Sequence, residues 1–143
     1  MKISAFADRD FKIPARDSND IIMHPYRFML NPDAIQQQRT FMPNEANGNT
    51  PGGKLSFDAV IDATGLVDPK RTNLPAEMQK IEAIVYTYNG QIHSPNFVKM
   101  EWGHHLTFYG TLISLDIAYT LFKPDGTPLR AKMSFVFEQC FPG

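Results

Sequence analysis

A turn signal between two long alternating segments places the strongest constraint on the fold. The sequence Pro-Asp-Gly at residues 124–126 interrupts residues 106–140, in which apolar and polar side chains alternate. Pro suits the first central position of a type I turn, Asp the second, and Gly the left-handed position that follows. Because such a turn fixes the register of the strands that it joins, we expect Lys123 to pair with Thr127. The sequence therefore predicts a long β-hairpin.

This register sorts the side chains of the hairpin into two faces. A slip of one residue would mix the faces, so turn and pattern agree on a single register. The apolar face would pair Leu121 with Leu129, Tyr119 with Ala131, Ile117 with Met133, Leu115 with Phe135, and Ile113 with Phe137. The other face would pair Thr120 with Arg130, Ala118 with Lys132, Asp116 with Ser134, and Ser114 with Val136.

Composition indicates one soluble globular domain spanning residues 1–143. The net charge of −1 gives no electrostatic case for a nucleic-acid or anionic-membrane partner. No apolar run approaches the roughly 20 residues of a membrane span, so we expect no membrane insertion. Charged residues stand where a signal peptide would be apolar. The single cysteine, Cys140, fits a reducing compartment.

The remaining alternation predicts further antiparallel strands. They are expected at residues 2–6, from Tyr26 onward, and at 35–41, 54–63 and 96–102. Residues 8–20 are charged and predict an arm. Residues 43–53, PNEANGNTPGG, predict a long flexible loop, and a loop of this length is usually disordered or used for binding.

One segment, residues 75–88, predicts a helix. Pro75 suits the first turn, and Asn-Gly at 89–90 provides a stop signal. Strands before and after a single helix favour a mainly β fold, an antiparallel sandwich or barrel with one packed helix. One arc of the helix is apolar and would cover the sheet; it carries Leu74, Met78, Ile81, Val85 and Tyr88.

No constellation for catalysis or metal binding emerges. His104 and His105 are adjacent, so on a strand they would point to opposite faces and could not easily share an ion. Asp58 and Asp62 would stand about 13 Å apart on one strand face, too far to cooperate, and are expected to be solvated. Cys140 is expected to be a buried, inert thiol. We therefore expect no enzyme, cofactor or metal.

The polar face of the predicted hairpin has two readings. Asp116 and Lys132 would be near-diagonal neighbours, and an exposed ion pair is worth under ~1 kcal/mol. Alternatively, sheets from several subunits could join edge to edge in a ring, whose channel this face would line. The candidate lumen-facing residues are then Asp116, Thr120, Arg130 and Lys132. A barrel closed within one chain would show a similar pattern.

Five segments carry a family resemblance. They are FMLNPD at residues 28–33, KLSFD with IDATG within 54–65, YNGQIHSPNF at 88–97, LISLDIAY at 112–119, and LFKPDGTPLRA at 121–131. Together they resemble the contractile injection system tube and baseplate family. Within it they are most similar to the tube-initiator proteins of the inner baseplate. The string at 121–131 is the most specific.

The resemblance implies the phage tail-tube fold and a non-catalytic role as a homo-hexameric ring. A tube initiator lies between the trimeric spike hub protein and the first ring of inner tube protein, next to other baseplate proteins, and it templates tube growth. Such particles assemble in the bacterial cytoplasm. Many relatives carry a LysM-like C-terminal domain, whereas this sequence stops at Gly143, directly after the last predicted strand.

We therefore expect a structural subunit at the baseplate end of an injection tube. The predicted loop at 43–53 is the candidate contact with a neighbouring ring, through Asn44, Asn47, Asn49 and Lys54. The alternative is a small-ligand-binding β-barrel, which requires a closed monomer with an apolar cavity. The charged second face of the hairpin suits a watery channel better than such a cavity.

Overall fold

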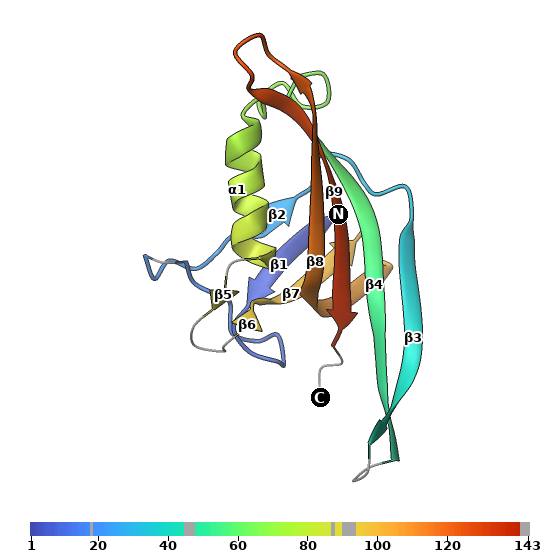
Figure 1. Ribbon diagram of the computed structural model, residues 1–143. Helices are drawn as coiled ribbons and strands as arrows, with labels where there is room; N and C mark the ends of the chain where they lie inside the picture. Colours follow the sequence, from blue (N-terminus) through green and yellow to red (C-terminus); the bar gives the residue numbers. More distant parts are fainter. Residues whose placement is uncertain (18, 45–47, 87, 90–93, 141–143) are drawn as a thin grey trace.

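A single antiparallel sheet, curled into a half barrel, carries one helix on one side (Figure 1). The computed structural model describes residues 1–17, 19–44, 48–86, 88–89 and 94–140. The sheet order is β2-β1-β7-β8-β9-β4-β3, and β5 and β6 form a separate ribbon. The elements are β1 (Lys2–Phe6), β2 (Tyr26–Arg27), β3 (Ile35–Asn44), β4 (Gly48–Asp62), α1 (Leu74–Val85), β5 (Tyr88–Asn89), β6 (Ser94–Pro95), β7 (Phe97–Trp102), β8 (Leu106–Phe122) and β9 (Pro128–Gln139).

The turn between β8 and β9 confirms the predicted register. The Lys123 amide donates to the Thr127 carbonyl at 2.8 Å. The Asp125 carboxylate accepts from the Thr127 amide at 2.9 Å. Gly126 has φ 92°, a left-handed conformation that favours glycine. The predicted pairs Tyr119–Ala131, Ile117–Met133 and Leu115–Phe135 are all present, as are the four predicted pairs of the polar face.

One predicted pair is wrong. Phe137 pairs with Leu112, because a β-bulge between Leu112 and Ser114 inserts Ile113 as an extra residue. The side chain of Ile113 is consequently half exposed. Since Leu112 and Ile113 are both apolar, the pattern offered no means of telling which one faces the core.

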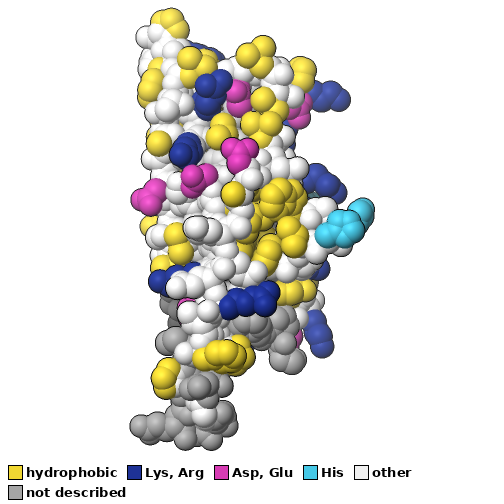
Figure 2. All heavy atoms as spheres, turned by 90° about the vertical axis from the view of Figure 1, so that its right-hand side faces the viewer, with side chains coloured by type: hydrophobic (Ala, Val, Ile, Leu, Met, Phe, Trp, Pro, Cys, Tyr) yellow, Lys and Arg dark blue, Asp and Glu magenta, His cyan; other side chains and the backbone are white. Residues whose placement is uncertain are grey.

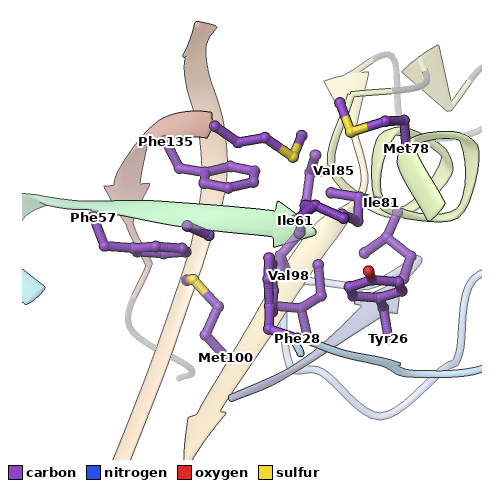
Figure 3. Close-up of a cluster of buried hydrophobic side chains, with 14 of the residues drawn as sticks. Tyr26, Phe28, Phe57, Ile61, Met78, Ile81, Val85, Val98, Met100 and Phe135 are labelled. Atoms are coloured by element: carbon purple, nitrogen blue, oxygen red, sulfur yellow. The ribbon is translucent and has the colours of Figure 1, made fainter. Parts of the chain in front are cut away.

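The core lies between the sheet and α1 (Figure 3). Three phenylalanines stack at its centre, with ring centroids 5.0 Å apart for Phe57 and Phe135 and 5.8 Å for Phe135 and Phe137. Phe28 meets Phe57 and Phe135 edge-on. Such aromatic pairs contribute about 0.5–1.5 kcal/mol each beyond the burial of area. Most of the predicted inward positions of β4, β7 and β9 are buried, and two, Trp102 and Leu129, are partly exposed. The buried ones are Leu55, Phe57, Ala59, Ile61, Val98, Met100, Ala131, Met133, Phe135 and Phe137.

The helix begins as the sequence predicts and ends earlier. The Asn73 side chain caps it by accepting from the Ala76 amide at 3.2 Å. It ends at Val85, where the Tyr86 amide donates to the Glu82 carbonyl. The prediction of a helix to residue 88 is wrong, because residues 88–89 pair with β6. Aromatic and β-branched residues at 86–88 are poor helix formers, so strand pairing is favoured over continuation of the helix.

The prediction of a loop at residues 43–53 is wrong for the described residues. β3 and β4 pair continuously from Ile35 and Phe57 to Asn44 and Gly48, and residues 45–47 lie outside the described part. β4 pairs with β9 only from Lys54 onward. Residues 39–44 and 48–53 therefore extend past the rest of the sheet as a two-stranded ribbon (Figure 1). We call residues 39–44 and 48–53 the projecting hairpin.

The charged arm is pinned to the sheet. The Ala15 amide donates to the Ala5 carbonyl at 3.0 Å, and the Ala7 amide donates to the Ile13 carbonyl at 2.8 Å. Phe11 packs on Tyr109, with ring centroids 4.6 Å apart. The one helix of the described residues is too short to cross a membrane.

Candidate assembly surfaces

The polar face is the side of the sheet that points away from α1. It carries the four residues predicted to face a lumen: Asp116 and Thr120 on β8, and Arg130 and Lys132 on β9. Asp116, Thr120 and Lys132 are exposed, and Arg130 is partly exposed. In Figure 2, which views the molecule from the side away from α1, acidic and basic side chains lie close together over the upper part. The face is thus charged but mixed in sign.

Ion pairs between β9 and β4 cross the polar face. Lys132 Nζ lies 3.5 Å from Asp58 Oδ2, whereas the sequence predicted Asp116 as its partner. The strand register explains the change of partner. Asp58 on β4 and Asp116 on β8 both pair with Ser134, which lies two residues after Lys132 on β9. Lys132 therefore has a carboxylate on each neighbouring strand within diagonal reach. The Asp58–Lys132 pair is more than half exposed at both ends, so it contributes little stability.

Asp62 contradicts the prediction of solvated carboxylates on β4. It is buried and accepts from Arg130 through Nε at 3.1 Å and Nη2 at 3.0 Å. The Thr64 amide and hydroxyl donate to its other oxygen. The Thr64 hydroxyl, the Thr64 amide and Arg130 together lower the pKa of Asp62 against the opposing effect of burial. The carboxylate thus ties the end of β4 to β9.

Two strands have an unpaired side in the sheet. β2 and β3 stand at its opposite ends, and β3 is ten residues long. Its side chains Gln36 and Gln38 are exposed on the polar face, opposite Ser56 and Lys54 of β4. A long exposed edge presents free backbone donors and acceptors to another strand. The sheet therefore has one long edge and one short edge available for pairing.

The predicted ring-contact residues lie on or near the projecting hairpin. Asn44 is the last residue of β3, Asn49 is near the start of β4, and Asn47 lies outside the described residues. Lys54 is where β4 meets β9, opposite Glu138. Sequence reasoning missed Phe41, whose side chain is 73% exposed on this hairpin. Its place in the alternation of β3 was the available signal.

A second exposed apolar region lies on β8. Tyr119, Leu121 and Phe122 are between 45% and 56% exposed. The expectation that the apolar side of β8 lies under the helix holds in part. Leu115 and Ile117 are partly buried against the core, whereas Ile113 and Tyr119 are 50% and 45% exposed. Tyr119 borders the start of α1, which covers it only in part. Leu66, in the loop after β4, is 87% exposed.

The sequence of the chain matches a known protein family over nearly its whole length. A family model described as contractile injection system tube protein matches residues 1–141. The chain belongs to this family. No curated protein matches it. Membership supports a structural role as a tube component of a phage tail-like system that assembles with other components of the tube or baseplate.

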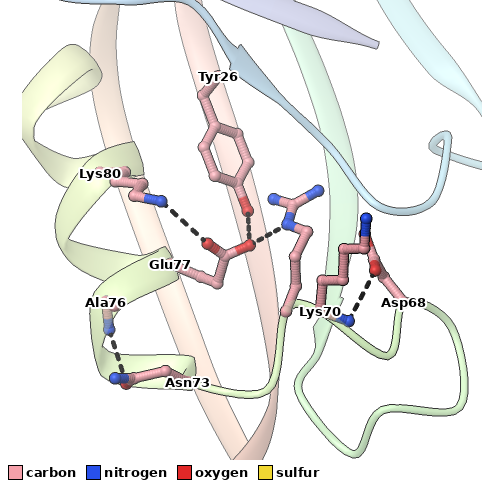
Figure 4. A network of polar contacts seen from close by, with 8 residues as sticks. Tyr26, Asp68, Lys70, Asn73, Ala76, Glu77 and Lys80 are labelled. Atoms are coloured by element: carbon pink, nitrogen blue, oxygen red, sulfur yellow. Dashed lines mark hydrogen bonds and ion pairs between the residues drawn. The ribbon is translucent and has the colours of Figure 1, made fainter.

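Within this tube-family chain, the most buried charge is on α1. Glu77 is 4% exposed, accepts from the Tyr26 hydroxyl at 3.3 Å, and pairs with Arg71 and Lys80 (Figure 4). Burial, followed by the charge of Glu77, raises the pKa of Tyr26, so the hydroxyl stays protonated and donates. Sequence reasoning missed this network, because its members come from three separate segments.

The tube-family chain brings no metal ligands together in the part that the structure describes. His104 and His105 are exposed in the turn between β7 and β8, while His93 lies outside the described residues. Cys140 is partly buried, and burial raises the pKa of its thiol. It donates only a long contact, 3.9 Å, to the Glu138 carbonyl.

Proposed function

We propose that this tube-family protein forms a hexameric ring at the baseplate end of the inner tube, joins the spike hub to the tube and templates tube growth. The observation that carries the proposal is the open, curled sheet with a different unpaired edge at each end. Unlike edges favour head-to-tail association, which closes into a ring when the rotation between subunits permits. The curvature of the sheet supplies such a rotation at each junction.

In this ring the polar face lines the channel and α1 lies outside. Asp116, Thr120, Arg130 and Lys132 then face the lumen. Two of the carboxylates beside them, Asp58 and Asp62, already neutralise the two cations. The channel wall is hydrophilic with little net charge on this stretch, which suits the passage of cargo without strong binding.

The projecting hairpin contacts the neighbouring ring. It leaves the sheet at Lys54 and exposes Phe41, and an isolated two-stranded ribbon is only marginally stable in water. Docking against the next ring, through Asn44, Asn47, Asn49 and Lys54, would stabilise it. We set aside the small-ligand-binding barrel, because the sheet order of the described strands is linear and not closed, whereas that alternative requires closure.

Native mass spectrometry and negative-stain microscopy of the tagged protein, purified from cells that make the particle, test the proposal. We expect hexamers, and particles labelled by the tag at the spike end only. Gln36→Lys combined with Gln38→Lys places two charges on the edge strand and should abolish hexamers while circular dichroism stays unchanged. Gln79→Lys, on the exposed side of α1, is the matched control. A monomer in the presence of intact particles, or labelling along the whole tube, would contradict the assignment.

A further inference from the structure

A groove separates α1 from the segment that precedes β2. Its volume is about 820 Å³, and it lies on the helix side of the molecule, away from the polar face and the projecting hairpin. One wall comes from residues 70–73 and α1, and the other from residues 21–27. Its second wall ends at Tyr26 and Arg27 of β2, the short edge of the sheet, and the rest of the groove belongs to none of the surfaces assigned above. Binding of a ligand in this groove can be measured on the chain whether or not the ring forms.

The first wall is basic. Lys70, Arg71 and Lys80 line it, and Arg27 adds a further cation from the opposite side. Its one carboxylate, Glu77, is buried and already engaged by Tyr26, Arg71 and Lys80 (Figure 4). Asp17 is the only other acidic lining residue. The groove as a whole therefore presents a surplus of positive charge to a ligand.

Arg71 is held in place for a ligand. Its guanidinium lies 5.1 Å from the centroid of the Tyr26 ring, and its Nε hydrogen-bonds to Glu77. Because Nε makes the bond to Glu77, that carboxylate does not take up the fork of terminal nitrogens. A planar arginine fork recognises a carboxylate by two parallel hydrogen bonds. The side chain is 24% exposed, so little conformational entropy remains to be lost on binding.

The second wall is apolar. Ile21 and Ile22 are 58% and 45% exposed, and Pro25 follows them along the groove. An extended chain places alternate side chains on opposite sides. A segment with carboxylates at every second position would direct these to the basic wall and its apolar side chains to the isoleucines.

We propose that the groove binds an extended acidic segment of another protein, in which carboxylates alternate with apolar residues. Nucleic acid fits less well. The chain has a net charge of −1, and of the two aromatic rings lining the groove Tyr26 is buried under Arg71, which leaves the imidazole of His24 as the single exposed ring for base stacking. The apolar wall would also have no counterpart on a phosphate backbone.

Fluorescence anisotropy with a labelled synthetic peptide of alternating Glu and Val tests the inference. We expect saturable binding that weakens at least about tenfold when Gln replaces every Glu in the peptide. Lys70→Glu combined with Lys80→Glu should weaken binding by a similar factor. Both lysines are exposed, and Glu77 keeps Arg71 and Tyr26 as partners when Lys80 is replaced, so the fold should persist in circular dichroism. Lys12→Glu combined with Lys123→Glu makes the same charge change at exposed sites outside the groove and should leave binding unchanged.

Amide hydrogen exchange locates the peptide, with protection expected at residues 21–27 and 70–84. Lack of binding, equal binding of the Gln peptide, or an equal loss in the control variant would overturn the inference. Tighter binding of a single-stranded oligonucleotide would assign the groove to nucleic acid and also overturn it. Self-association abolished by the groove variant alone would assign it to a second copy of this chain.

Discussion

The Asp62→Asn variant tests whether the ion pair between Asp62 and Arg130 contributes more to stability than the exposed pair between Asp58 and Lys132. The Asn side chain keeps one oxygen, which can still accept from the Thr64 amide and hydroxyl. Its NH2 group replaces the oxygen that accepts from Arg130, so the two charged hydrogen bonds from Arg130 are lost. Hydrogen bonds to charged groups contribute about 1.5–3 kcal/mol each, which sets an upper bound near 3–6 kcal/mol. Arg130 is 41% exposed and can regain water, so we expect a loss of about 2–3 kcal/mol in the free energy of unfolding.

The loss should depend on pH in a defined direction. The pKa of Asp62 is lower in the folded protein than its ordinary value of 3.8. A lowered carboxyl pKa contributes stability that is fully present above the unfolded value and is lost as the pH falls through the folded value. Because Asn does not titrate, the difference between wild type and Asp62→Asn should be constant near neutral pH and should shrink below pH 3.8.

Urea denaturation of the monomeric protein at pH 7 and at pH 3 measures both effects. Asp58→Asn is the matched control, since its ion pair with Lys132 is exposed and should contribute less than about 1 kcal/mol. A double-mutant cycle with Arg130→Met should give a coupling energy of about 1–2 kcal/mol. Equal costs for the two Asp→Asn variants, or a difference for Asp62 that does not change with pH, would refute the reasoning.

Substitutions at three further sites probe the core, the helix cap and the projecting hairpin. Phe135→Ala removes a ring stacked between Phe57 and Phe137 and should cost about 3–5 kcal/mol in urea denaturation; a cost below about 1 kcal/mol would contradict the packing. Asn73→Ala should cost about 1 kcal/mol in thermal melts, whereas Asn73→Asp, which can still cap, should be nearly neutral. Gly53→Ala would place a Cβ 2.1 Å from the Gln38 carbonyl oxygen, so β3 should lose hydrogen-exchange protection while β9 keeps it; unchanged protection in β3 would disprove the close approach.

The β8–β9 hairpin could be predicted because two independent signals agree. Turn chemistry at residues 124–126 and the alternation on both sides select the same register, which the structure keeps from Thr120 and Arg130 to Ser114 and Val136. The helix start could be predicted from Pro75, and the Asn73 cap that the structure adds two residues earlier agrees with it. Where a single local signal stood alone, as for the helix end, pairing of residues 88–89 with the nearby strand β6 overrode it.

Three features could not be read from the sequence because non-local partners decide them. Glycines leave gaps in the alternation, so residues 48–53 resemble a loop until β3 is placed beside them. Asp58 and Asp62 occupy equivalent places in the pattern of β4, yet only Asp62 is buried, because Thr64 and Arg130 reach it. Glu77 looks like an ordinary first-turn helix residue until Tyr26 and Arg71 surround it.

Several positions that an isolated domain does not account for are exposed apolar side chains. Phe41 on the projecting hairpin and Ile113, Tyr119 and Leu121 on β8 are apolar side chains that the chain itself leaves uncovered. A monomer gains nothing by exposing them, and contiguous exposed apolar surface in a soluble protein commonly marks an interface. The ring that we propose would have such interfaces at both the edges and the ends of each subunit. Burial of these exposed side chains against neighbouring subunits would then supply free energy for a ring to form and for the next ring to add.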